Sequence, residues 1–378
     1  MNFSRLVLPG ITMIAVTYGL ARFSYGLLLP SMNNDLEMSS VVSGTISSLF
    51  YLSYCIAIVI SMIYTPKKGP RNMIVAAGIS AFIGLFIMAI SPNVWVLGVG
   101  VLFSGASTGL ASPPFGAAIS FWIEQKKQGK ANTWVNSGTS IGIVLTGAGA
   151  FILASEWRLT YFIYALIALL AVIWNWQVLP KTRPQPRVTS KKRSFSLRGI
   201  ERILPLIICS ISLGISTAAF WTFSIDFIES TGSYSDWSLS MFWITIGIFG
   251  ILGGFSGMCI DRFGLPLTYR WTSIAIGLSS ILVAVFPEHR VIAFSSAALF
   301  GISYILITGL LMVWGIRVFV TNASLGIGTP FLLLAVGQVI GSLFAGMLID
   351  GLGFSTTFVI YGLFGFFAMV LGPKKIKE

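Results

Sequence analysis

The amino-acid sequence predicts an all-α membrane protein with twelve transmembrane helices in two pseudo-symmetric six-helix bundles. Of the 378 residues, 55% are hydrophobic and only 10% are charged, whereas soluble domains carry about 25% charged residues. Apolar runs long enough to cross a bilayer as helices recur along the whole chain. Several glycine, proline and aromatic residues of the first half also recur in the second half at a nearly constant spacing.

The predicted spans are separated by short clusters of glycine, proline and charged residues, which favour loops. Such clusters include TPKKGPRN and EQKKQGK in the first half and DRFGLP and FPEHR in the second. Lipid offers no hydrogen-bond partners, so each span must be helical, and the ten-residue alternation of a membrane β-barrel does not occur. In chain order the predicted spans are 6–30, 39–64, 72–91, 95–119, 131–154, 158–179, 203–228, 238–260, 269–286, 291–313, 325–349 and 355–372.

A basic polar segment separates the sixth span from the seventh. It comprises residues 181–202, KTRPQPRVTSKKRSFSLRGIER, and contains Pro184 and Pro186. Its composition predicts a cytoplasmic linker between two membrane domains. We therefore expect an N-terminal bundle over 1–180 and a C-terminal bundle over 203–378.

The distribution of Lys and Arg predicts the orientation. With the N-terminus in the cytoplasm, 21 of the 24 Lys and Arg residues fall in cytoplasmic segments, as the positive-inside rule requires. Arg158 and Arg290 then lie outside, and Arg22 lies within the membrane. We expect a multi-pass protein of the bacterial cytoplasmic membrane with both termini in the cytoplasm. The same distribution accounts for the net charge of +12 without a nucleic-acid partner.

The two halves of the sequence carry matching residues. Trp122 and Trp314 are 192 residues apart, and Tyr164 and Tyr361 are 197 apart. These spacings are close to the spacing of 195 residues that three further pairs share. The nearly common spacing predicts a parallel internal duplication, a design in which binding sites lie between the halves near the midplane. The pairs separated by 195 residues are Gly19 with Gly214, Gly69 with Gly264, and Pro92 with Pro287.

The first span contains a guanidinium group inside the apolar stretch TYGLARFSYGLLLP, residues 17–30. Tyr18, Arg22 and Tyr25 share one helix face, at i, i+4 and i+7. A charge at this depth costs about 2.5–3.5 kcal/mol on insertion scales. Two interpretations remain. The favoured one is that Arg22 faces a cavity and binds a carboxylate or phosphate by paired hydrogen bonds; the other is that it snorkels to the membrane surface.

The chain resembles the major facilitator superfamily over essentially its full length. Gly257-x-x-x-Asp261-Arg262-x-Gly264, after the eighth span, is similar to the superfamily loop motif G-x-x-x-D-R-x-G. The segment EWRLTYF, 156–162, resembles the usual junction between the fifth and sixth spans. A glycine-rich face of the fifth span resembles the antiporter-type motif without its proline; it is formed by Gly138, Gly142, Gly147 and Gly149.

Other stretches depart from the motifs or resemble subgroups. In the first-half loop, Pro66 stands where the motif has Asp. The stretches GLARFSYGLLLP and LLLAVGQVIGSLFAG are most similar to the YbfB/YjiJ group. SPPFGAAISFW followed by KKQGKA is similar to carriers of small organic anions.

The resemblance implies that the first, fourth, seventh and tenth spans line a central cavity. Each hydroxyl on these spans has the alternative of bonding a neighbouring helix or its own. Gln338 in the eleventh span is added because a buried primary amide needs partners, although helix packing also explains it. The second span carries a further polar stripe, Ser47, Tyr51 and Tyr54. The implied substrate-binding residues are Arg22, Tyr18, Tyr25, Ser104, Thr108, Trp221, Tyr304, Thr308 and Gln338.

The resemblance also implies gating residues. Asp261 is expected against the N-terminus of the span beginning near Ala131, where it latches the inner gate while the site faces outward; the alternative is a plain surface loop. Asp226 is the carboxylate inside the seventh span. It is expected to pair with Arg22, to titrate and couple protons, or simply to be exposed at the outer mouth. The gating set is Gly257, Asp261, Arg262, Gly264 and Asp226.

We therefore expect a secondary transporter that moves a small organic anion or zwitterion by alternating access. One alternative is a proton-coupled exporter of amphipathic drug-like compounds, and another is a non-transporting receptor or scaffold. An enzyme is not expected, because His289 is the single histidine and no metal, cofactor or nucleophile pattern occurs. The expected partners are a small-molecule substrate, the lipid bilayer and a proton or other coupling ion, and the chain is expected to be a monomer.

Overall fold

The computed structural model describes residues 3–153, 156–181, 200–319 and 323–373, which form helices joined by short turns. Eleven helices in these ranges, with the first span counted as one, are long and apolar enough to cross a membrane. The twelfth predicted span is the shorter apolar helix α14, Phe354–Val370. The predicted all-α membrane fold is confirmed.

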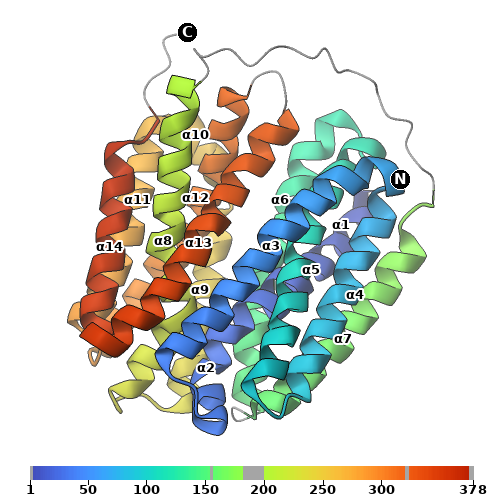
Figure 1. Ribbon diagram of the computed structural model, residues 1–378. Coiled ribbons are helices and arrows are strands. Elements are labelled where there is room, and N and C mark those ends of the chain that lie inside the picture. Colours follow the sequence, from blue (N-terminus) through green and yellow to red (C-terminus); the bar gives the residue numbers. More distant parts are fainter. Residues whose placement is uncertain (1–2, 154–155, 182–199, 320–322, 374–378) are drawn as a thin grey trace.

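The helices of the first half follow the six predicted spans (Figure 1). The first span has three parts: α1, Phe3–Ile14; the π-helical segment η1, Ala15–Phe23; and α2, Ser24–Leu36. A π-helical segment inside a span frequently marks a functional site, and η1 contains Arg22. The remaining helices are α3, Ser40–Lys68; α4, Pro70–Ala89; α5, Val94–Trp122; α6, Gln125–Ile152; and α7, Trp157–Val178.

The second half repeats this order. The eighth predicted span, 238–260, is divided into two helices, because the chain is interrupted at Gly254 and Phe255, directly after Gly253; consecutive glycines weaken a helix. Besides α14, the helices are α8, Ile200–Ser230; α9, Asp236–Gly253; α10, Ser256–Phe263; α11, Leu265–Val285; α12, Arg290–Val318; and α13, Ala323–Leu352.

The predicted start of the fifth span is wrong. EQKKQGK was expected to be a loop, but α6 begins at Gln125 rather than at residue 131. Lys126, Lys127 and Lys130 are exposed, so the helix continues past its apolar part with its charges in water. Residues 182–199 of the predicted linker, and the C-terminal lysines at 374, 375 and 377, lie outside the described residues.

Close glycine contacts recur at equivalent positions of the two halves. Gly19 packs against Gly142, and Gly214 packs against Gly337. In each pair a methyl group on the first glycine would overlap the second glycine's backbone, and both members of the second pair lie 195 residues after those of the first. The repeat predicted from single residues is therefore also a repeat of helix contacts.

The same offset appears in the turns. Gly69 and Gly264 each end a helix with a positive φ, +84° and +76°, which favours glycine. A proline follows each of them within two residues and lies in the first turn of the next helix. In addition, the hydroxyls of Tyr164 and Tyr361 donate to backbone carbonyls of α6 and α13.

The two halves meet along three helix pairs: the first span with α8, α3 with α13, and α6 with α9. Gly26 and Trp221 face each other at equivalent positions, 195 residues apart, and a methyl group on Gly26 would overlap the Trp221 carbonyl oxygen. A methyl group on Gly44 would likewise overlap the Ser342 carbonyl oxygen. These contacts lie toward the end of the bundle that holds the α2–α3 turn, at the bottom of Figure 1. We call it the outer end, after the predicted orientation.

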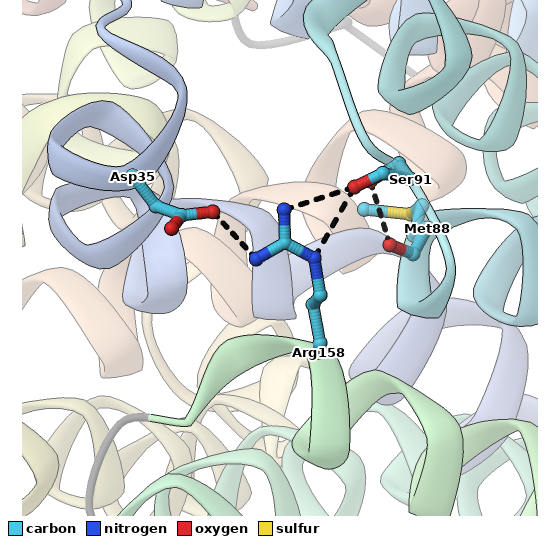
Figure 2. Close-up of polar contacts among 4 residues, drawn as sticks. All are labelled: Asp35, Met88, Ser91 and Arg158. Carbon is cyan, nitrogen blue, oxygen red and sulfur yellow. Dashed lines mark hydrogen bonds and ion pairs between the residues drawn. The ribbon is translucent and has the colours of Figure 1, made fainter.

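Arg158, at the start of α7, ties three helices together at the outer end of the first half (Figure 2). Its Nη1 donates to Asp35 Oδ2 at 2.5 Å, and its Nε and Nη2 donate to the Ser91 carbonyl at 3.2 and 3.0 Å. The guanidinium also lies 4.1 Å from the Trp157 ring centroid. The ends of α2, α4 and α7 are thus joined by one side chain.

Replacing Arg158 with alanine should lower the melting temperature of the detergent-solubilised protein more than replacing Asp35 with asparagine. The ion pair is 40–45% exposed, and exposed pairs contribute only about 0.2–1 kcal/mol. Arg158 also supplies two hydrogen bonds to the Ser91 carbonyl, which Asp35→Asn leaves intact. Equal shifts in a thermal melt of the two variants would contradict this account.

Candidate functional site

Arg22 lies between the two halves of the molecule rather than toward lipid. Its side chain projects from the last turn of η1 and is 8% exposed. Its Nη2 donates to Tyr304 Oη at 3.0 Å and to Gln338 Oε1 at 2.9 Å. Both acceptors belong to the second half, on α12 and α13. The snorkelling interpretation is therefore wrong.

The surroundings of Arg22 are aromatic and uncharged. The guanidinium carbon lies 4.8 Å from the ring centroid of Phe23, 5.3 Å from that of Tyr51 and 5.6 Å from that of Tyr54. Within the described residues, the two ion pairs are Lys127–Glu124 and Arg158–Asp35, and neither involves Arg22. A buried cation is thus held by neutral hydroxyl, amide and ring groups alone.

A small cavity lies beside this guanidinium. It measures about 10 Å³, which is room for about one water molecule. Two of the residues that line it have a buried donor without a hydrogen-bond partner among the described residues, Arg22 at Nε and Trp221 at Nε1. The lining residues are Arg22, Phe23, Tyr25, Gly26, Ser47, Phe50, Tyr51, Trp221 and Thr222.

The predicted substrate-binding residues fall into two groups. Arg22, Tyr304 and Gln338 are joined by hydrogen bonds, and Trp221 and Tyr25 line the cavity. The ring of Tyr18 also lies beside the site, 5.8 Å from the guanidinium carbon of Arg22, while its hydroxyl pairs with Ser112 at 2.5 Å. The other hydroxyls bond helices instead: Ser104 donates to Met88 Sδ at 3.6 Å, Thr108 donates to the Thr17 carbonyl at 2.7 Å, and Thr308 donates to the Ile305 carbonyl at 2.7 Å.

The structure also brings residues to the site that the predicted set omitted. Phe23, Tyr51 and Tyr54 surround the guanidinium. Tyr51 and Tyr54 belong to the second span, which the superfamily pattern did not place at the cavity. Their spacing from Ser47, i+4 and i+7, was the available signal. Phe23 carried no signal, because an aromatic residue in an apolar span is ordinary.

Asp226 takes part in a hydrogen-bond chain between the halves near the outer end. Asn33 Nδ2 of α2 donates to Asp226 Oδ2 at 3.2 Å, and Ser43 Oγ of α3 donates to Asn33 Oδ1 at 2.7 Å. Asn33 follows Arg22 by eleven residues, about 16 Å along a helix. The expected pairing of Asp226 with Arg22 is therefore absent from this conformation, and Asp226 instead helps to close the outer end.

Replacing Asn33 with alanine should open the outer end more often, because the chain between Ser43 and Asp226 is then broken. A single cysteine at position 47, in a protein whose native cysteines are replaced, reports access to the cavity. We expect a membrane-impermeant thiol reagent added outside to label it several-fold faster in the Asn33→Ala variant. Asn93→Ala, which also removes an amide at the outer end, is the control. An unchanged labelling rate would contradict a role of the Ser43–Asn33–Asp226 hydrogen bonds in closing the outer end.

The family model of the Major Facilitator Superfamily matches residues 11–329. The chain belongs to this superfamily. It is 23% identical over 343 residues to the Transcription regulatory protein OpdE of Pseudomonas aeruginosa, covering 88% of this chain and 84% of that protein. It is 24% identical over 197 residues to the Multidrug resistance protein 1 of Bacillus subtilis, covering 51% and 50% of the two chains. The crystal structure of a D-xylose-proton symporter shares the fold, with a TM-score of 0.78, 15% identity and coverage of 97% and 96%.

The superfamily loop motif lies at the inner end, opposite the α2–α3 turn. Asp261 and Arg262 are exposed on α10, which packs against α11 and α12 of its own half. Gly264 supplies the positive φ that turns the chain into α11, and a side chain on Gly257 would meet nothing within 4 Å. The expected latch on α6 stays a prediction for a conformation in which the inner end is closed.

Proposed function

We propose that this superfamily member is a secondary transporter of a small organic anion or zwitterion, which Arg22 binds between the two halves. One observation carries the proposal. Arg22 and Trp221 line the same cavity between the halves, and each carries a buried donor without a partner among the described residues, Nε and Nε1. A buried donor without a partner costs about 1–3 kcal/mol, and more when it is charged, so an acceptor that reaches both donors is favoured.

Electrostatics supports a negatively charged group. Burying a cation without a counter-charge is expensive, and the partners of Arg22 are the neutral groups of Tyr304 and Gln338. A carboxylate accepts two parallel hydrogen bonds from a guanidinium, and these are roughly twice as strong as neutral ones. Substrate therefore gains by replacing the two neutral acceptors.

The same contacts support alternating access. The acceptors Tyr304 and Gln338 belong to the second half and Arg22 to the first, so separation of the halves frees the guanidinium. A cavity of about 10 Å³ does not admit an organic molecule until the halves separate. We propose that substrate enters from the cytoplasmic or the outer side in turn, with both termini in the cytoplasm as the Lys and Arg distribution favours.

Two relatives favour other functions. The name Multidrug resistance protein 1 and the aromatic surroundings of Arg22 favour an exporter of drug-like compounds. The name of OpdE, a transcription regulatory protein, favours a receptor that does not transport. The first predicts dye flux that does not need Arg22, and the second predicts binding without flux.

Counterflow in liposomes tests these functions together. Purified protein is reconstituted and supplied with labelled organic anions or with cationic dyes, and Arg22→Ala is measured alongside. Arg317→Ala, which removes an exposed cation at the end of α12, is the matched control. Anion exchange that is lost only with Arg22→Ala supports the proposal. Dye exchange independent of Arg22, or no exchange of any solute, refutes it.

A further inference from the structure

The charges around Arg22 limit the substrate to one net negative charge. Every other described Lys or Arg lies in a turn or within two helical turns of a helix end. The position equivalent to Arg22 in the second half, 195 residues later, is Thr217, which lies 3.5 Å from Gln338 Nε2. Of these two equivalent positions, only the one in the first half therefore carries a cation. A second anionic group would be buried without a partner, at high cost.

The same environment does not favour an ammonium group. The carboxylate of α8 that lies inside the membrane part, Asp226, is five residues nearer the outer end than Trp221 and already accepts a hydrogen bond from Asn33 of the first half. The rings that attract cations, Tyr51 and Tyr54, already lie within 6 Å of the guanidinium. An ammonium group here would be repelled by Arg22 and would have no described carboxylate to offset it.

The walls next to the two donors are planar rings from opposite halves. Phe23 of η1 lies against Trp221 of α8, with ring centroids 4.0 Å apart and planes inclined by 32°. Trp221 also meets Tyr304 edge-on, at 4.9 Å. When the halves separate, Phe23 and Trp221 each expose a ring face at the place where the donors lie. A flat apolar body between them replaces that one contact with two, each worth about 0.5–1.5 kcal/mol beyond area burial.

We propose that the substrate of this transporter is an aromatic monocarboxylate. Its carboxylate accepts from Arg22, and its ring stacks between Phe23 and Trp221. This inference rests on the proposed function and narrows it, because it excludes zwitterions and dianions. Transport requires no covalent step. The groups that contact the substrate are Arg22 and Phe23 of η1 and Trp221 of α8.

Calorimetric titration of the purified protein with four carboxylic acids tests the inference. Benzoate is the aromatic monoanion, terephthalate adds a second carboxylate, 4-(aminomethyl)benzoate adds an ammonium group, and cyclohexanecarboxylate has one charge but no planar ring. We expect benzoate to bind at least tenfold more tightly than each of the others. We also expect Trp221→Leu, which keeps an apolar side chain but lacks the ring face, to weaken benzoate binding about tenfold and to leave cyclohexanecarboxylate binding unchanged.

The outcomes separate this inference from the proposed function. Arg22-dependent binding in which terephthalate or the zwitterion equals benzoate overturns the inference and leaves a transporter anchored at Arg22. Equal binding of cyclohexanecarboxylate overturns the stacking contact. If none of the four acids binds in a manner that depends on Arg22, the proposed function fails as well. The comparison among the four acids uses the unaltered protein, so it does not depend on how a variant folds. The dependence on Arg22 is measured by titrating Arg22→Ala with the same acids.

Discussion

Replacing Arg22 with methionine is expected to abolish anion exchange and at the same time to raise the melting temperature of the protein measured without substrate. Transport is lost because charge-assisted hydrogen bonds contribute about 1.5–3 kcal/mol each. Two of them correspond to at least a hundredfold in affinity. Stability rises because the guanidinium is buried among neutral groups, and an apolar side chain of similar length removes its uncompensated charge.

The opposite signs of the two effects distinguish a binding residue from a structural one. If Arg22 mainly held the helices together, its loss would lower both transport and stability. A thermal melt in detergent and counterflow in liposomes measure the two quantities. Arg22→Lys is the informative second variant, because it keeps the charge but not the paired hydrogen bonds. We expect it to retain less than a tenth of the exchange. A melting temperature that falls by several degrees for Arg22→Met would contradict the account.

Replacing Gly26 with valine is expected to prevent closure of the outer end and to reduce exchange at least tenfold. The added side chain would overlap the backbone carbonyl of Trp221 in the other half. Because a carbonyl within a helix cannot move independently, the first span and α8 must separate. Alternating access requires both ends to close in turn, so a protein held open at one end does not complete a cycle.

Labelling of a cysteine at position 47 measures this effect directly. We expect an impermeant reagent outside to label it at least tenfold faster in Gly26→Val, with Gly26→Ala intermediate. Gly116→Val is the control, since a side chain there meets nothing within 4 Å, and it carries the same change in helix propensity. If Gly26→Val folds, as judged by gel filtration, and still exchanges substrate at the rate of the unaltered protein, the proposed closure of the outer end at Gly26 is contradicted.

The fold could be predicted because it depends on properties of short stretches of sequence, namely the length of each apolar run and the residue type at each turn. A span is recognised by some twenty apolar residues. A repeat is recognised by residues such as Gly69 and Gly264, whose positive φ makes the residue type necessary. The start of α6 was mispredicted for a related reason: hydropathy marks where the apolar part ends, whereas the helix continues to Gln125 with its lysines in water.

The site could be predicted only in part. A charge in an apolar span indicated Arg22 without reference to any other residue, and the need of an amide for partners indicated Gln338. For Ser104, Thr108 and Thr308 the sequence left two interpretations open, and in this structure each hydroxyl donates to a sulfur or carbonyl of a helix. Sequence does not distinguish a hydroxyl that satisfies a neighbouring helix from one that faces a cavity.

The sequence by itself determined the membrane class, the twelve spans, the repeat and the buried cation, because hydrophobic length and charge cost are properties of single segments. Only the tertiary structure decided which groups surround that cation. Tyr304 and Gln338 reach Arg22 from across the pseudo-symmetry axis, 282 and 316 residues away in the chain. Such partners are brought together by the packing of helices that are distant in the chain, which the properties of a single segment do not record.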